Sequence, residues 1–145
     1  MMAKRILVPL DGSESAEVAA SLAADLARGS GGDVRLLQVY PVPEHRVSNT
    51  GRVVAYADQE MERLSAEGRD YLESVEAQLA PVSTETVVRF GEPEQEILVE
   101  AEAFDADMIV VTASRRSWLG RLIGSGLGEK LLHGSPVPVV VVRAA

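Results

Sequence analysis

The chain has 145 residues, of which 46% are hydrophobic and 25% are charged, a composition that is ordinary for one globular domain spanning residues 1–145. Its net charge of -8 disfavours binding to nucleic acid or to an anionic membrane, and the lack of cysteine excludes disulfides, thiolate nucleophiles and cysteine-ligated metals. No apolar run approaches the roughly 20 residues that cross a bilayer, and the first ten residues carry no signal-peptide pattern, so we expect a cytoplasmic protein.

The first half of the chain alternates apolar runs with helical patterns. Residues 5–10 are apolar on both faces, as is typical of a buried parallel strand, and the polar residues 11–14 favour a turn and a helix cap. Apolar residues recur at helical spacing over 16–27, which predicts a helix. The glycines that follow, at 29, 31 and 32, end this predicted helix. Residues 33–40 predict a second strand.

The middle of the chain opens with an irregular segment. Residues 41–55 carry no sustained period, so we expect a long surface loop there. A second helix is predicted from 58 to about 79, with Pro81 marking its end. Residues 83–90 predict a third strand, and Pro93 suits the first position of a third helix.

The last third completes the alternation of strands and helices. Residues 107–111 predict the fourth strand, residues 126–132 the last helix and residues 137–142 the fifth strand. This order predicts an α/β fold, with a parallel sheet covered by helices on both faces through right-handed crossovers. Ligands in such folds bind beyond the carboxyl ends of the strands, where the winding reverses.

The stretch from Val110 to Gly128 has the order of a phosphate-binding loop. It passes from an apolar run through an arginine-bearing loop to glycines at 124, 126 and 128, just before the last helix. Unpaired N–H groups and the helix dipole favour an anion there, and glycines let the backbone approach it closely. The alternative is that these glycines serve only as turn and cap residues.

Three segments in the right order give the chain its resemblance to a known family. Residues 6–19 (ILVPLDGSESAEVA), 91–111 and 123–143 (IGSGLGEKLLHGSPVPVVVVR) resemble the universal stress protein family. The resemblance implies a three-layer flavodoxin-like (adenine nucleotide alpha hydrolase-like) fold, with a five-stranded parallel sheet in the order 3-2-1-4-5. It also implies a homodimer through the last strand, residues 137–142, and a subset of members that bind ATP or another adenine nucleotide.

The nucleotide-binding subset has a motif of Gly, two residues, Gly, nine residues, then Gly followed by Ser or Thr. This chain keeps the end of the motif as Gly124-Ser125, whereas the first two glycine positions fall on Thr112 and Arg115. Aligned from Gly124 instead, they fall on Val111 and Ser114. Where a left-handed backbone is required, the replacement costs roughly 1–2 kcal/mol, and a bulky side chain can instead block the phosphate. We expect neighbouring glycines and arginines to compensate.

Carried over position by position, the resemblance implies an adenine-nucleotide site. Pro9 and Leu10 would contact the base, Asp11 would accept a hydrogen bond from a ribose hydroxyl, and Val39 would lie against the adenine. Val111 and Thr112 would line the entrance of the loop. The phosphates would be bound by Gly124, Ser125, Gly126 and Leu127, and Arg115 would pair with phosphate oxygens. The bound group would be ATP, ADP or AMP, with or without Mg²⁺. Both Asp11 and Ser125 have the alternative role of a helix cap.

The sequence assigns no reaction, because no nucleophile, base and orienting group occur together. Slow ATP hydrolysis is the most that these residues allow. The predicted function is that of a homodimeric stress-response regulator or sensor that binds an adenine nucleotide. The alternative is a dimeric stress protein that binds no nucleotide and acts through protein partners. The apolar last strand would be an aggregation hazard at a bare sheet edge, which pairing with a second subunit removes.

Overall fold

The computed structural model describes residues 4–44, 57–113, 131 and 133–143, together with the backbone of 46–47 and 53–55. The strands of the described residues are β1 (Arg5–Leu10), β2 (Asp33–Tyr40), β3 (Arg46–Val47), β4 (Val53–Ala55), β5 (Ser83–Phe90), β6 (Met108–Ala113) and β7 (Val139–Arg143). The helices are a 3-10 turn (Glu14–Ala16), α1 (Glu17–Ser30), α2 (Ala57–Leu79) and α3 (Pro93–Phe104). None of these helices is long and apolar enough to span a membrane.

The main sheet has five strands in the order β5-β2-β1-β6-β7, and each neighbouring pair is parallel. Without the small β3–β4 pair, this is the expected order 3-2-1-4-5, so the predicted fold class is confirmed. The chain starts at the central strand and winds outward first through β2 and β5, then through β6 and β7. The winding therefore reverses at β1, where α/β folds place their ligands.

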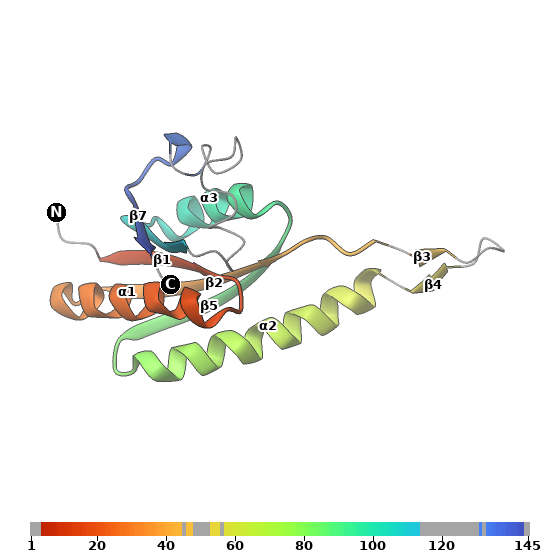
Figure 1. Ribbon diagram of the computed structural model, residues 1–145, viewed down its shortest axis with the longest axis horizontal. Coiled ribbons are helices and arrows are strands. Elements are labelled where there is room, and N and C mark those ends of the chain that lie inside the picture. The colour runs from red at the N-terminus through yellow and green to blue at the C-terminus, as the bar shows by residue number, and fades with distance from the viewer. Residues whose placement is uncertain are drawn as a thin grey trace.

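Helices cover both faces of the sheet (Figure 1). Side chains alternate along a strand, so Ile6 and Val8 face the layer of α1 and α2 whereas Leu7 faces α3. The buried residues of α1 are all alanines, and their small side chains let the helix pack closely on the sheet. The buried positions of this helix are Ala19, Ala20, Ala23, Ala24 and Ala27.

Glycines set the connection from α1 to β2. Gly31 has a φ of 69° and its N–H donates to the carbonyl of Ala27, which ends the helix. A Cβ on Gly32 would lie 2.5 Å from the carbonyl oxygen of Lys4, so only glycine lets the chain pass β1 here. Gly29 lies inside the helix, which corrects its predicted place beyond the helix end.

The predictions for two other segments need correction. The segment 41–55 contains the short antiparallel pair β3–β4, whose strands of two and three residues are too short to produce a sequence period. The fourth and fifth strands lie slightly later than predicted, at β6 and β7. Pro138 precedes β7, and its carbonyl accepts a hydrogen bond from Ile109; since proline has no N–H, the ladder begins after it.

An ion-pair network joins α3 to the neighbouring strands β2 and β5. Glu100, whose side chain is only 4% exposed, pairs with Arg35 at 2.6 Å and with Arg89 at 3.1 Å. Burial lowers the pKa of Arg35, but its hydrogen bonds to Glu100 and Glu85 outweigh this and raise the pKa above its ordinary value. The Arg35 guanidinium also lies 4.2 Å from the centre of the Phe104 ring. Both arginines therefore keep their charge while fixing α3 to the sheet.

Candidate functional site

Three neighbouring strands end at one edge of the sheet and bring the first set of predicted residues together. β1 lies between β2 and β6, and all three run in the same direction. Their carboxyl ends therefore share one edge. The predicted residues at that edge are Pro9, Leu10, Asp11, Val39, Val111 and Thr112.

The apolar members of this set are packed into the two cores. Leu10 lies in the core beneath α1 and α2, whereas Val39 and Val111 lie in the core beneath α3. The exposed fraction is 1% for Leu10, 9% for Val39 and 0% for Val111. Asp11, which directly follows β1 and is half-exposed, therefore provides the polar side chain at this end of the strand.

Asp11 organises the turn that follows β1. One of its oxygens, Oδ1, accepts hydrogen bonds from the Ser13 amide at 3.0 Å and from the Ser13 hydroxyl at 2.5 Å. The Ser13 hydroxyl in turn accepts from the Ala16 amide at 3.3 Å, so Ser13, not Asp11, caps the 3-10 turn. Because a carboxylate has several acceptor positions, holding this turn is compatible with a contact to a ribose hydroxyl.

Thr112 uses its hydroxyl to hold the start of α1. Its Oγ1 accepts a hydrogen bond from the Ala19 amide at 3.2 Å and donates to the Ala16 carbonyl at 3.4 Å. The side chain is 3% exposed and is thus turned toward α1, onto the same face of β6 as Val110. In the alignment that starts from the fourth strand, the first motif glycine would fall on Thr112, and the Thr112 hydroxyl holds the start of α1.

Comparison with known proteins identifies the family. The model of the universal stress protein family matches residues 2–143. The chain belongs to this family. Universal stress protein MJ0531 of Methanocaldococcus jannaschii is 30% identical over 144 residues, which are 97% of this chain and 82% of that protein.

Solved structures of similar proteins agree with the fold. Hypothetical protein MJ0577 of the same organism, itself a universal stress protein, superposes with a TM-score of 0.79 at 24% identity, covering 100% of this chain and 99% of that one. A universal stress protein in complex with cAMP superposes with a TM-score of 0.66 at 21% identity, covering 98% of both chains. At these identities the similarity shows the arrangement of strands and helices.

The second set of predicted residues in this universal stress protein lies outside the described residues. It comprises the phosphate loop and its arginine: Arg115, Gly124, Ser125, Gly126 and Leu127. Most of the predicted last helix, 126–132, lies outside them as well, although Leu131, His133 and Gly134 are helical. The described part of the site therefore consists of the ends of β1, β2 and β6.

Two polar side chains near this edge were not predicted. Gln38 on β2 is 7% exposed, and its Oε1 has no hydrogen-bond partner among the described residues. The buried hydroxyl of Tyr71 on α2 has no partner within the same part of the chain. Burial raises the pKa of Tyr71, the carboxylates of Glu17 and Asp11 raise it further, and the amide of Gly12 opposes them. The only sequence signal was the polar Gln38 inside an otherwise apolar strand end, LLQVY.

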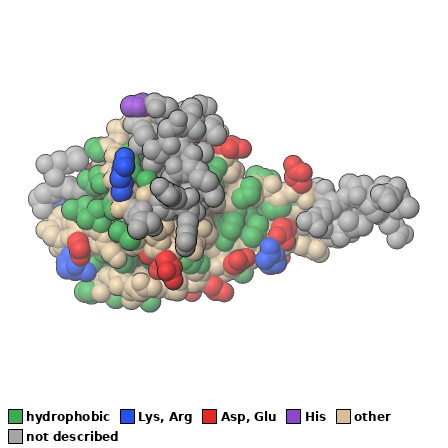
Figure 2. Space-filling model, viewed as in Figure 1, with side chains coloured by type: hydrophobic (Ala, Val, Ile, Leu, Met, Phe, Trp, Pro, Cys, Tyr) green, Lys and Arg blue, Asp and Glu red, His purple; other side chains and the backbone are tan. Residues whose placement is uncertain are grey.

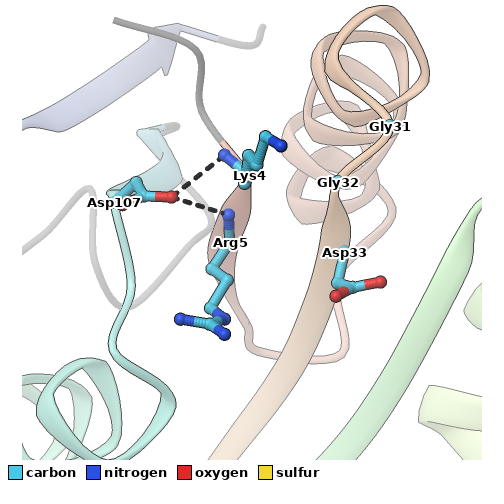
Figure 3. Close-up of a pocket in the computed structure, with 6 residues that line it drawn as sticks. All are labelled: Lys4, Arg5, Gly31, Gly32, Asp33 and Asp107. Atoms are coloured by element: carbon cyan, nitrogen blue, oxygen red, sulfur yellow. Dashed lines mark hydrogen bonds between the residues drawn. The ribbon is translucent and has the colours of Figure 1, made fainter.

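A hollow of about 380 Å³ lies at the opposite edge of the sheet, around the amino ends of β1 and β2 (Figure 3). There Asp107 Oδ2 accepts hydrogen bonds from the amides of Lys4 and Arg5, each at 3.0 Å. The hollow is lined by two acidic residues, Asp33 and Asp107, and two basic ones, Lys4 and Arg5, so its lining has no excess of positive charge to attract a phosphate. On the face shown in Figure 2, the described Lys and Arg side chains lie apart from one another and form no basic patch.

Proposed function

We propose that this universal stress protein binds an adenine nucleotide at the carboxyl edge of β2, β1 and β6, and that it acts as a nucleotide-dependent regulator or sensor in the cytoplasm. The edge lies where the winding of the sheet reverses, which is the general ligand position in such folds. The structural relative in complex with cAMP supports an adenine nucleotide as the ligand class.

The observation that carries this proposal is the direction of the Thr112 side chain. Where the motif is aligned on the fourth strand, its first glycine falls on Thr112, and a side chain that projected toward the phosphates there would weaken the case for nucleotide binding. Thr112 instead donates to and accepts from the backbone of Ala16 and Ala19, on the α1 face of the sheet. These hydrogen bonds orient the Thr112 side chain toward α1, which supports the view that a threonine at this position is compatible with a bound nucleotide.

Each group of the nucleotide has a proposed partner. Asp11 accepts from a ribose hydroxyl, while Pro9, Leu10 and Val39 border the adenine. The backbone amides at 124–127 and the guanidinium of Arg115 hold the phosphates, since helix N-terminal amides and arginine both favour phosphate oxygens. Val111 and Thr112 lead from the base to the phosphate loop. The ligand is ATP, ADP or AMP, with Mg²⁺ as a phosphate-bound ion.

Two measurements test the proposal. Denaturing the purified protein should release ATP, ADP or AMP, and titration with Mg-ATP in a calorimeter should give saturable binding. Asp11→Asn removes the charge that accepts from the ribose and should weaken binding about tenfold. Gly124→Val, which puts a side chain into the phosphate loop, should abolish binding.

A matched control is Asp25→Asn, which removes an exposed carboxylate of α1 that pairs with Arg28 at 2.8 Å. It makes the same chemical change away from the site, so its affinity should equal that of the unaltered protein. If millimolar nucleotide neither binds nor is released on denaturation, the alternative holds: a dimeric stress protein that acts through protein partners.

We further propose that the protein is a homodimer through its last strand. β7 pairs with β6 on one side and is the outermost strand of the described sheet. Its four valines, Val139 to Val142, are only half-buried. An apolar edge strand of this kind invites pairing with another strand, and a two-fold axis satisfies both subunits at once.

A further inference from the structure

The helix α3 begins with a buried acidic side chain. Glu94 is the second residue of the helix and is only 6% exposed. Among the described residues its side chain makes no hydrogen bond and no ion pair, whereas Glu96 and Glu100 of the same helix both pair with arginines. A buried carboxylate without a partner is costly, and the dipole of a first helical turn offsets only part of that cost. Glu94 therefore offers an acceptor that a ligand can use.

The start of α3 lies beside the carboxyl end of β2. The amide of Gly91, two residues before the helix, donates a hydrogen bond to the carbonyl of Tyr40 at 2.9 Å. Tyr40 is the last residue of β2, and the centre of its ring lies 5.9 Å from that of Phe90. Val39, the proposed neighbour of the adenine, directly precedes Tyr40. The chain therefore enters α3 at the edge of the sheet where the base is proposed to bind.

Glu94 lies on the face of α3 that packs on the sheet. Ile97 and Ala101 follow it after three and seven residues, spacings that return to one side of a helix, and both are buried. They share one core with Val39 and Val111, which lie near the carboxyl ends of their strands. Because the Cα–Cβ bonds of a helix tilt toward its N-terminus, the Glu94 side chain leads from this face toward the carboxyl edge.

The chemistry of a carboxylate suits one purine better than the other at this place. An ionised carboxylate only accepts hydrogen bonds, and the donor that adenine offers is its 6-amino group. Guanine carries a carbonyl oxygen at that position, which would meet the carboxylate as a second acceptor. The apolar side chains of Pro9 and Val39 would contact either purine without reading its substituents. A contact to Glu94 would supply the distinction.

We propose that Glu94 determines base specificity at this edge by accepting a hydrogen bond from the 6-amino group of adenine. This inference rests on the proposed function and extends it, because it names the residue that selects the base. The carboxylate then gains its partner when the nucleotide binds. Its alternative role is to stabilise α3 through the helix dipole, and that role does not depend on which base is bound.

Purine riboside triphosphate, which lacks only the 6-amino group of ATP, tests the contact without altering the protein. In calorimetric titrations with Mg²⁺, the unaltered protein should bind it about 10- to 100-fold more weakly than ATP, because a hydrogen bond to a charged group is lost. Glu94→Ala should bind ATP about as weakly and should no longer distinguish the two nucleotides. The two losses should not add, since both remove the same hydrogen bond.

Glu94→Gln provides a second variant, of the same shape. Its amide can donate to the carbonyl oxygen of guanine, so the preference for ATP over GTP should fall about tenfold or more. The matched control is Glu102→Gln, which makes the same change at an exposed position near the other end of α3. This control should keep the nucleotide preference of the unaltered protein. A role limited to the helix dipole would change the stability of Glu94→Gln and leave its preference unchanged.

Equal affinity of the unaltered protein for ATP and purine riboside triphosphate would overturn this inference and leave the proposed function intact. A Glu94→Ala variant that still prefers ATP to the same extent would overturn it as well. If the unaltered protein binds neither nucleotide, the proposed function fails, and the inference fails with it because Glu94 then has no base to select.

Discussion

Thr112 of β6 caps the first turn of α1 by accepting a hydrogen bond from the backbone amide of Ala19 at 3.2 Å. The helix cannot cap itself there, because its N-cap residue is Ala16, which has no polar side chain. The amides of a first helical turn have no partner within the helix, so a buried one needs an acceptor from elsewhere. Thr112 supplies this acceptor from a strand 93 residues away in the sequence.

Replacing this hydroxyl should lower stability. Thr112→Val keeps the shape of the side chain but leaves the Ala19 amide buried without an acceptor, which we expect to cost about 1–3 kcal/mol in the free energy of unfolding. Thr112→Ser keeps the hydroxyl and should lose clearly less. Urea unfolding followed by circular dichroism measures both, and equal stability of the two variants would show that the hydrogen bond contributes nothing.

Two glycines inside helices should respond oppositely to alanine. Gly29 of α1 has open space around the position of a Cβ, so Gly29→Ala should stabilise the protein by about 0.5–1 kcal/mol through helix propensity. A Cβ on Gly68 of α2 would lie 3.0 Å from both Tyr40 and Val88. Overpacking typically costs about 1–3 kcal/mol, so Gly68→Ala should destabilise despite the same gain in propensity. Chemical unfolding measures the free energy of unfolding of both variants. A higher value for Gly68→Ala than for the unaltered protein would refute the tight contact at Gly68.

Tyr71 should make stability fall at alkaline pH. Burial, followed by the carboxylates of Glu17 and Asp11, raises its pKa above the ordinary value of 10.0. The folded state therefore holds the phenolic proton more tightly than the unfolded chain does. This contribution is complete below about pH 10 and is lost as the pH rises from there toward the folded pKa.

The comparison that isolates this effect is between the unaltered protein and Tyr71→Phe. Between about pH 9 and 11.5, the free energy of unfolding of the unaltered protein should fall more steeply than that of the variant. Tyr40, whose pKa is also raised by burial, remains in both proteins and cancels from the difference. Parallel slopes in urea titrations at several pH values would mean that Tyr71 ionises as readily in the folded state as in the unfolded chain.

Local rules were sufficient for much of the fold. The apolar run of β1, the helical spacing of α1 and the position of Pro93 each depend on a few adjacent residues, and the structure confirms these predictions. The order of strands did not follow from such rules. It came from the resemblance to universal stress proteins, because alternation predicts parallel strands without saying which ones are neighbours.

The interior polar contacts were beyond sequence reasoning. No local pattern distinguishes Glu100 from the other glutamates of α3, yet it bridges arginines from two different strands. The sequence places Thr112 at a motif glycine position and at the entrance of the phosphate loop, but it does not predict the hydrogen bond to α1, because Thr112 and Ala19 are close only after folding. The predicted ends of β1, β2 and β6 do share one edge, whereas the loop at 124–127 stays a prediction outside the described residues.

The proposed homodimer predicts a particular effect of a charge on β7. Val140→Lys places an ammonium group at a half-buried position in the middle of the outermost strand of the described sheet. A lysine on an edge strand opposes pairing with another strand, because pairing would bury its charge. In sedimentation velocity at micromolar concentration, we expect the unaltered protein to be a dimer and the variant to be a monomer.

Leu26→Lys is the control, because it adds the same charge on the outer side of α1, where Leu26 is 39% exposed. It should remain a dimer, and circular dichroism should show that both variants are folded. Since lysine can extend its ammonium group toward water, Val140→Lys should be tolerated by the monomer itself. A monomeric unaltered protein, or a folded Val140→Lys that stays dimeric, would mean that β7 is not the contact between subunits.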